Sequence, residues 1–305
     1  MALAVKTTPS LARALVREAR PKQWLKNVLV FAAPAAAGVI DEPTELGRSL
    51  LAFVAMCLVS SGTYYWNDLF DLEADRSHPT KQHRPIASGL IPLPIARGVG
   101  VGLLLAGCGV AALTGRWQAV VVVAFYAVLT LSYTVIWKHV AVLDLVVVAS
   151  GFVLRAAAGA VATDVAMSDW FVLVTTFGSL FIVAGKRYAE LHELGEGATL
   201  TRATLGDYSL QYLRMVVSVA CGGTLISYCM WAFERANERL ATNDLELPLY
   251  QLTIVPMLAA LLRYLLVLER GNGHGAAPED VFSDDRVLQL LGLAWVVTFG
   301  LAVYL

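Results

Sequence analysis

The stretch from Leu50 to Asp75, LLAFVAMCLVSSGTYYWNDLFDLEAD, places acidic residues at the end of an apolar run that is long enough to cross a membrane. Four oxygen-bearing residues in it are spaced by three, four and four positions, so on an α-helix their side chains share one face. They are Tyr64, Asn67, Asp71 and Asp75. Magnesium prefers a few protein oxygens together with phosphate oxygens. The spacing therefore predicts a site for Mg²⁺ and a diphosphate.

The alternative for this stretch is a solvated helix end whose acids pair with the cations that follow. Those cations are Arg76, Lys81 and Arg84. Several oxygen-bearing side chains on one face are costly near lipid unless a cation joins them, which favours the metal site. Asp75 is further from the membrane and lies beside Arg76, so a structural role for Asp75 stays open.

The composition indicates that the chain folds in a lipid bilayer. Of the 305 residues, 57% are hydrophobic and only 15% are charged, and the mean hydropathy is +0.63. Apolar runs of about 17–25 residues recur and predict about nine transmembrane helices. The expected spans are residues 28–40, 50–66, 95–113, 119–136, 140–162, 171–184, 215–233, 249–268 and 288–304. We therefore expect an all-α integral membrane protein with a single transmembrane domain over residues 1–305, because lipid cannot satisfy free backbone groups.

Basic residues are distributed unequally between the two sides of these spans. If the N-terminus is cytoplasmic, the inner side receives most of them, which agrees with the positive-inside rule. The inner residues are Arg13, Arg17, Arg20, Lys22, Lys26, Arg76, Lys81, Arg84, Lys138, Lys186, Arg187, Arg202, Arg214, Arg270 and Arg286, and the outer ones are Arg48, Arg116, Arg235 and Arg239. The acidic motif is thus expected at the cytoplasmic face of the plasma membrane. Residues 1–20 form either an interfacial amphipathic helix or a flexible basic tail.

Several classes of site are disfavoured by the sequence. The net charge of −1 gives no reason to expect a nucleic-acid partner. The four cysteines fall in apolar runs without paired spacing, which disfavours a disulfide or zinc framework, and the five histidines lack ligand spacing. Small-residue helix faces pack within one chain or between chains, so a homo-oligomer stays open.

Two groups of cations flank the acidic motif. Lys81 and Arg84 follow it in KQHRPIASG (81–89), and phosphate binding would explain why both signs of charge occur together. Lys22 and Lys26, one helical turn apart in PKQWLKN (21–27), either bind phosphate or snorkel where the chain enters the membrane. Tyr64 is either a hydrogen-bonding partner for phosphate or ribose or a packed interfacial tyrosine.

Three of these motifs together resemble the UbiA superfamily of intramembrane prenyltransferases. They are PKQWLKN (21–27), NDLFDLEAD (67–75) and RPIASG (84–89). The resemblance implies a bundle of nine helices around a cavity that opens to lipid and is capped on the cytoplasmic side. It also implies that Asn67 and Asp71, together with Asp75, hold Mg²⁺ on a diphosphate.

The sequence departs from the family pattern after the sixth expected span. Ordinary members carry a second cluster of aspartates there, whereas this chain reads GKRYAELHE (185–193). Lys186 and Arg187 thus replace acidic residues, and such cations bind phosphate oxygens without a bridging metal ion. The exchange suggests a lipid monophosphate beside a sugar diphosphate. Glu190, one turn beyond Lys186, could orient a cation or a ribose hydroxyl.

This pattern resembles one branch of the superfamily, the decaprenyl-phosphate phosphoribosyltransferases. KHVAVLD (138–144), GFVLRAAAG (151–159) and KRYAE (186–190) carry the resemblance. The implied reaction transfers a phosphoribosyl group from 5-phosphoribosyl 1-diphosphate to a polyprenyl phosphate, which supplies precursors of arabinogalactan and lipoarabinomannan. The residues expected to bind the donor are Lys22, Lys26, Tyr64, Lys81 and Arg84, and those for the lipid phosphate are Lys186 and Arg187. The opposite assignment of the two cation groups fits the sequence equally well.

Other polar residues are weaker candidates. Arg155 lies within an expected span, where a charge marks function by default, but a structural partnership, for example with Asp144, is weighed above catalysis. Tyr133 and Lys138 lie near the inner end of the fourth long run and are supporting candidates. Two other functions stay open: a prenyl transfer from prenyl diphosphate to an aromatic acceptor, and transport or flipping of a phosphorylated lipid.

Overall fold

A computed structural model of the chain describes residues 10–194, 203–240, 248–270, 281–282 and 284–305, so Arg202 lies outside the described residues. Every regular element in these segments is a helix. The long α-helices are α3 (Pro43–Phe70), α5 (Leu93–Ala112), α6 (Trp117–Val135), α7 (Leu143–Ala162), α8 (Asp169–Leu194), α10 (Leu210–Leu240), α12 (Ile254–Arg270) and α14 (Arg286–Tyr304). The short elements are α1 (Leu11–Glu18), α2 (Ala32–Ala36), α4 (Leu72–Ser77), α11 (Leu249–Leu252) and the 3-10 helices η1 (Pro21–Phe31), η2 (Lys81–His83), η3 (Trp137–His139) and η5 (Ala203–Asp207).

The described part of the chain contains eight helices that are long and apolar enough to cross a membrane. The all-α membrane architecture is thereby confirmed, but the expected count of nine is not. The run at residues 28–40 forms the end of the 3-10 helix η1 and the five-residue α2, and not one α-helix of spanning length. Pro34 lacks the N–H that an α-helix would donate to the Val30 carbonyl, and Gly38, at φ +70°, turns the chain soon afterwards.

The chain divides into two compact units. Unit 1 comprises residues 1–35, 39–135 and 154–165, and unit 2 comprises residues 36–38, 136–153 and 166–305. The boundary falls within α7, so this helix contributes its first half to unit 2 and its second half to unit 1. The single transmembrane domain expected from the sequence stays a prediction.

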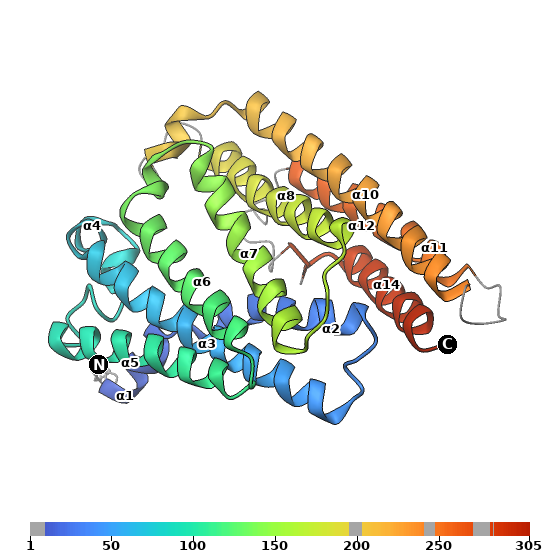
Figure 1. The fold of residues 1–305 in the computed structure, drawn as a ribbon. Helices are drawn as coiled ribbons and strands as arrows, with labels where there is room; N and C mark the ends of the chain where they lie inside the picture. Colours follow the sequence, from blue (N-terminus) through green and yellow to red (C-terminus); the bar gives the residue numbers. More distant parts are fainter. Residues whose placement is uncertain (1–9, 195–202, 241–247, 271–280, 283) are drawn as a thin grey trace, which may run out of the picture. The chain divides into compact units, whose positions relative to one another are not determined.

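In unit 1, α3 packs along α5 and also contacts α6 and η1 (Figure 1). Gly107 of α5 sits directly on α3, because a Cβ atom there would lie 2.3 Å from a methyl group of Val59. Met56 and Val59 of α3 are fully buried in the resulting core. Small residues at such helix crossings allow the close backbone approach that stabilises packing within a membrane.

A second close approach brings η1 onto the second half of α7. A Cβ atom on Gly159 would lie 1.7 Å from the Val30 carbonyl oxygen, and Val30 is fully buried. Glycine is therefore the only residue that fits at position 159 without moving η1. This contact determines where the polar residues of η1 meet α7.

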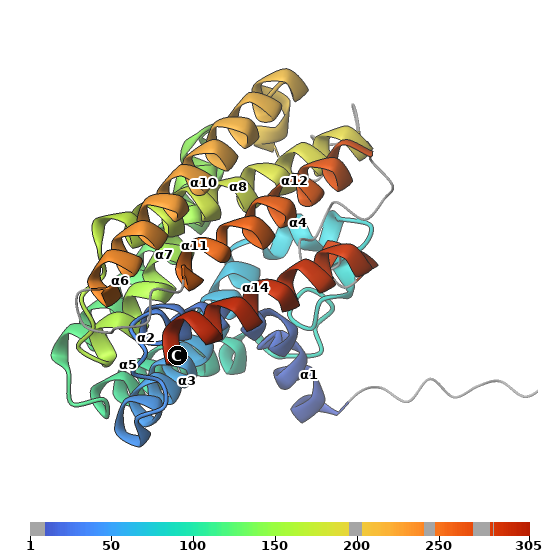
Figure 2. The same cartoon turned by 90° about the vertical axis from the view of Figure 1, so that its right-hand side faces the viewer.

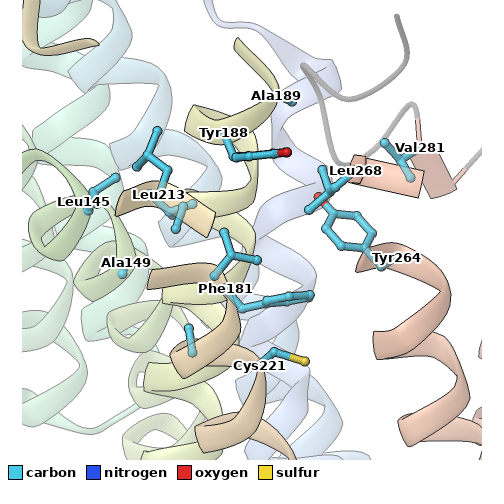
Figure 3. Packing of buried hydrophobic residues seen from close by; sticks show 14 of the residues in the cluster. Leu145, Ala149, Phe181, Tyr188, Ala189, Leu213, Cys221, Tyr264, Leu268 and Val281 are labelled. Atoms are coloured by element: carbon cyan, nitrogen blue, oxygen red, sulfur yellow. The ribbon is translucent and has the colours of Figure 1, made fainter. Parts of the chain in front are cut away.

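In unit 2, α8 packs along α10, and α12 packs along α14 (Figures 1 and 2). Their buried side chains form one hydrophobic cluster (Figure 3) that includes Phe181 and Tyr188 of α8, Leu213 of α10 and Tyr264 of α12. The Phe181 and Tyr264 rings lie 5.4 Å apart between centroids. This packing fixes the C-terminal half of α8, which carries Lys186 and Arg187.

We predict that Gly159→Ala destabilises the protein by about 1–3 kcal/mol, the usual cost of overpacking a close contact. The added methyl group would have to displace the backbone at Val30. Thermal unfolding of the purified protein in detergent measures the effect. Gly109→Ala on α5 is the matched control, because a Cβ atom there meets nothing within 4 Å; equal stability of the two variants would contradict the close contact.

Candidate active site

The end of α3 carries the two residues best suited to hold a metal ion. Asn67 lies in the last turn of α3, and Asp71 separates α3 from α4. The Asp71 N–H donates to the Asn67 carbonyl at 2.9 Å, so the helical register predicted from the spacing continues through this junction. Thr134 of α6, which the sequence did not single out, donates to Asn67 Oδ1 at 3.1 Å. This hydrogen bond orients the amide oxygen of Asn67.

These residues fit Mg²⁺ as part of a coordination shell. Amide and carboxylate oxygens suit this ion, which usually takes one or two carboxylates and completes its shell with phosphate oxygens and water. Within the described segments, no group of three or more His, Cys, Asp or Glu side chains is placed to hold a metal ion alone. The arrangement therefore suits a magnesium ion that shares its ligands with a bound diphosphate.

Asp75 makes different contacts from Asn67 and Asp71. Its carboxylate is 3% exposed and accepts a hydrogen bond from Arg84 Nη1 at 2.7 Å. Burial raises the pKa of Asp75 above its ordinary value, although Arg84 and Lys81 oppose the shift. The contacts favour the structural role that the sequence left open for Asp75, and metal binding by Asp75 stays a prediction. Lys81, in η2, is half-buried near this ion pair.

Asp68 is the buried acid that the sequence analysis missed. Its carboxylate is 1% exposed and accepts hydrogen bonds from Arg20 Nη2 at 2.6 Å and from Arg84 Nη1 at 3.0 Å. Arg84, predicted to bind the donor phosphates, therefore joins Asp68 to Asp75. Arg20 lies 48 positions away in the sequence, so no local spacing could have revealed this ion pair.

Glu18, at the end of α1, is the second missed acid. It is 1% exposed, and neither carboxyl oxygen has a hydrogen-bond donor in the described part of the chain. Burial, followed by hydrogen bonding and repulsion with Asp68, raises the pKa of Glu18 to about 8. The carboxyl group of Glu18 is therefore mostly protonated at neutral pH and can donate to Asp68. Of the two forms left open for residues 1–20, the described part forms a helix, and the acid at its end is buried.

The two lysines of η1 do not share a face, contrary to the expectation for an α-helix. In a 3-10 helix, side chains four positions apart differ by about 120°. Accordingly, Lys22 is exposed whereas Lys26 is half-buried. The neighbouring Trp24 donates to Ser61 Oγ at 3.0 Å, which attaches η1 to α3. Binding of phosphate by either lysine stays a prediction.

Tyr64 lies one turn before Asn67 and is covered by a guanidinium group. The Arg20 Cζ atom lies 4.9 Å from the centroid of the Tyr64 ring, within the range of a cation–π interaction. The ring is only partly exposed. Both uses left open for Tyr64, in packing and in hydrogen bonding, are compatible with this position.

Arg155 is the buried cation of unit 1 and is 6% exposed. Its Nε donates to Asn27 Oδ1 at 2.8 Å and its Nη2 donates to the Tyr126 hydroxyl at 2.7 Å. Asn27 in turn donates to Ser60 Oγ at 3.3 Å. A partnership with Asp144 was wrong, because eleven residues separate the two along α7, about 16 Å at the helical rise. The structural role expected for Arg155 takes the form of a cross-link among η1, α6 and α7.

In unit 2, Arg187 lies between two acids. Its side chain is 4% exposed, and it pairs with Asp144 Oδ2 at 3.5 Å and with Glu190 Oε2 at 3.1 Å. Asp144 is fully buried and also accepts a hydrogen bond from the Tyr208 hydroxyl. Burial, and then this hydrogen bond, raise the pKa of Tyr208 above its ordinary value. Glu190 thus orients a cation, which is one of the two roles expected for it.

Lys186 differs from its neighbour Arg187. Its ammonium group is half-buried and has neither a hydrogen bond nor an ion pair within the described residues. Of the two neighbouring cations Lys186 and Arg187, Lys186 is therefore the one that forms no ion pair with any described residue. The contacts make Lys186 the better candidate for an anion, whereas Arg187 is committed to Asp144 and Glu190.

The remaining candidates are the supporting residues. Tyr133 precedes Thr134 in the last turn of α6 in unit 1, and Lys138 lies in η3 of unit 2. Both are half-buried. Their roles stay predictions, as does the electrostatic pairing between the metal-binding residues of unit 1 and the cations of unit 2.

Solved structures establish the class of fold. A UbiA homologue from Archaeoglobus fulgidus, solved bound to GPP and Mg²⁺, matches 95% of this chain and 99% of its own chain with a TM-score of 0.69 at 17% identity. The model of the UbiA prenyltransferase family matches residues 28–272. The chain therefore belongs to the UbiA prenyltransferase family, and it is a multi-pass membrane protein.

Two curated relatives place the chain within this family. The decaprenyl-phosphate phosphoribosyltransferase of Corynebacterium glutamicum is 43% identical over 302 residues, which cover 97% of this chain and 88% of that protein. The protein of the same name from Mycobacterium tuberculosis is 41% identical over 302 residues, which cover 96% and 95%. The resemblances drawn from the sequence motifs, to the superfamily and to this branch, are confirmed.

The raised pKa of Glu18 predicts a pH-dependent stability. In the folded protein Glu18 keeps its proton to a higher pH than in the unfolded chain, where it ionises at its ordinary pKa. The stability that neutral Glu18 contributes is therefore fully present below the ordinary pKa. It is lost as the pH rises to about 8. Glu18→Gln, which cannot ionise, should gain unfolding temperature relative to the parent protein across this window. A difference between the two proteins that does not change with pH would contradict the prediction.

Proposed function

We propose that this protein transfers the 5-phosphoribosyl group from 5-phosphoribosyl 1-diphosphate to a polyprenyl phosphate such as decaprenyl phosphate, with release of diphosphate. The observation that carries the proposal is the uncommitted cation Lys186, in a UbiA-family chain that has Lys and Arg where ordinary members have aspartates. Full-length relatives named decaprenyl-phosphate phosphoribosyltransferase support the same substrates. The product would supply precursors of cell-wall arabinogalactan and lipoarabinomannan.

The donor binds at the end of α3 in this proposal. Asn67 and Asp71 hold Mg²⁺, which when bound neutralises negative charge on the departing diphosphate. Arg84 and Lys81 contact the phosphate oxygens, because a guanidinium or ammonium group forms strong hydrogen bonds to them. Lys22, Lys26 and Tyr64 are further candidates for contacts with the same substrate.

The lipid phosphate binds near the C-terminal end of α8. Lys186 contacts the phosphate oxygens directly, and Arg187 keeps the helix end in place through Asp144 and Glu190. A point charge without a protein partner within the described residues loses no existing ion pair when an anion arrives. The assignment of the lipid phosphate to this cation, and not to those near α3, belongs to the proposal.

The reaction needs no strong general base, because the attacking lipid phosphate is already an anion. One of its oxygens forms a bond to C1 of the ribose while the bond from C1 to the diphosphate oxygen breaks. The diphosphate leaves with the electron pair of that bond. Attack on the face opposite the leaving group inverts C1, and the protein contributes mainly by positioning the two substrates and by stabilising charge.

The topology proposed for this reaction has the N-terminus and both phosphate sites on the cytoplasmic side. The positive-inside rule supports this orientation. Phosphoribosyl diphosphate is a charged, water-soluble molecule, so a cytoplasmic site would meet it directly. The polyprenyl chain would remain in the bilayer.

Prenyl transfer to an aromatic acceptor is the second candidate function. The UbiA homologue solved with GPP and Mg²⁺ binds a prenyl diphosphate, and this supports prenyl transfer as an alternative. The absence of a second aspartate cluster from residues 185–193 argues against it. A transporter of phosphorylated lipid would not require the oxygen-rich helix end at Asn67 and Asp71.

We predict that the purified protein releases diphosphate from 5-phosphoribosyl 1-diphosphate only when both polyprenyl phosphate and Mg²⁺ are present. Asp71→Asn should raise the Mg²⁺ concentration required, because one anionic ligand is lost. Phosphate analysis and chromatography of the lipid product measure the reaction. A folded protein that forms no phosphoribosyl lipid, but prenylates an aromatic acceptor, would establish the alternative.

We predict that Lys186→Asp raises the KM for polyprenyl phosphate by about 10- to 100-fold or more, because one charged hydrogen bond is lost and the new carboxylate repels the phosphate. The Mg²⁺ dependence should stay nearly unchanged, and Lys186→Arg should restore most of the lipid affinity. Steady-state kinetics with each substrate varied separately give the comparison. Arg235→Asp, which reverses a charge paired with Glu238 elsewhere in unit 2, is the control. Unchanged lipid kinetics in Lys186→Asp would remove Lys186 from the proposed site.

A further inference from the structure

One buried carboxylate in unit 1 holds three donor groups in place. Asp68 is 1% exposed and accepts hydrogen bonds from Arg20 at 2.6 Å, from Arg84 at 3.0 Å and from the Asn67 amide nitrogen at 3.1 Å. Each partner belongs to a different position in the chain: the junction after α1, the end of η2 and the last turn of α3. A single side chain thus fixes the surroundings of a predicted metal ligand.

The two arginines keep part of their guanidinium groups available. Arg20 uses only Nη2 for Asp68, and Arg84 uses only Nη1 for both Asp68 and Asp75. Their other guanidinium nitrogens form no hydrogen bond within the described residues. The side chains are 27% and 28% exposed, whereas Asp68 behind them is buried. Such an arrangement presents two oriented guanidinium groups to an anion.

The carboxyl group of Glu18 lies against this cluster. Glu18 is buried without a donor within the described residues, and its nearest charged neighbours include Asp68, Arg20 and Arg84. Asp68 and Asp75 pair with Arg20 and Arg84, so neither arginine needs a bound anion in order to stay in place.

We propose that Asp68, supported by Glu18, is a positioning residue that presents Arg20 and Arg84 to the phosphate groups of the sugar diphosphate. This inference rests on the proposed function and extends the donor site to the N-terminal segment. Glu18 and Arg20 precede residue 28, where the match to the family model begins. The N-terminal helix α1 is therefore a working part of the donor site and not only a membrane-surface anchor.

The role of Asp68 requires an ionised acceptor. Asp68→Asn keeps the size of the side chain but replaces one acceptor oxygen with a donor NH₂ group, which cannot accept from a guanidinium. Arg20 and Arg84 would then share one neutral acceptor oxygen in place of a carboxylate, so both would be held less firmly. Because the lipid phosphate is bound elsewhere in the proposed function, its affinity should not depend on Asp68.

The test is steady-state kinetics of Asp68→Asn with 5-phosphoribosyl 1-diphosphate and polyprenyl phosphate varied in turn. We expect the KM for the sugar diphosphate to rise about tenfold, with a smaller change in the KM for the lipid. Asp164→Asn is the matched control, because Asp164 pairs with Arg116 at 2.8 Å in the same unit, away from the donor residues. A purely structural role for Asp68 would change both KM values alike in the folded variant, and that result would overturn the inference.

Arg20→Gln provides a second test if Asp68→Asn does not fold. It keeps the pair between Asp68 and Arg84 and removes one of the two presented guanidinium groups. The KM for the sugar diphosphate should again rise selectively, and an unchanged value would overturn the inference. The proposed function fails separately: it falls if the parent protein forms no phosphoribosyl lipid, whereas an active parent with an unaltered donor KM in these variants removes only the role of Asp68.

Discussion

Charged side chains that are buried in an apolar helix bundle require partners, because removing an ion from water costs several kcal/mol that only close hydrogen bonds and opposite charges can offset. Three buried residues of this protein follow this constraint in different ways. Asp68 is paired with two arginines, Arg155 donates to neutral oxygens, and Asp144 accepts from Arg187 and a tyrosine hydroxyl. Each group of contacts joins helices that are distant in the sequence, so the same interactions that accommodate the charges also fix the helices.

The constraint also separates cations that hold the fold from cations that are suited to bind substrate. Arg187 is buried between two acids, and its pairing would have to be broken before it could bind a phosphate with full strength. Lys186, one residue earlier, is half-buried and has no such pair within the described residues. Two adjacent basic residues that look equivalent in the sequence therefore have different environments. The difference depends on the direction in which each side chain points from α8. Two consecutive basic residues in a sequence do not show that direction.

The all-α membrane fold could be predicted from the sequence because it depends on local periodicity, and the same periodicity placed Asn67 and Asp71 in one helical register, whereas their binding of Mg²⁺ stays a prediction. Hydropathy indicated a span at residues 28–40 but not its form, which is the end of the 3-10 helix η1 followed by the short α2, because Pro34 interrupts a regular α-helix. The sequence missed Asp68 because its partner Arg20 is remote in the chain. The signal was present, since Asp68 is one turn from Tyr64 and Glu18 is the sole acid in an otherwise basic and apolar stretch of residues 11–22. The ion pair between Arg20 and Asp68 could be identified only from the tertiary structure.

Backbone strain occurs beside two of the buried acids, Asp68 and Asp144. Arg20 has φ 52° and Val142 has φ 69°, values that non-glycine residues rarely adopt and that are least favourable for a β-branched side chain such as valine. A residue in this region costs about 1–3 kcal/mol and persists only where the surroundings determine it. Arg20 is held by Asp68, and the Val142 N–H donates to the hydroxyl of Tyr208, which itself donates to Asp144. In each case a buried carboxylate offsets a strained turn, and the turn in return brings a distant segment of the chain to the acid.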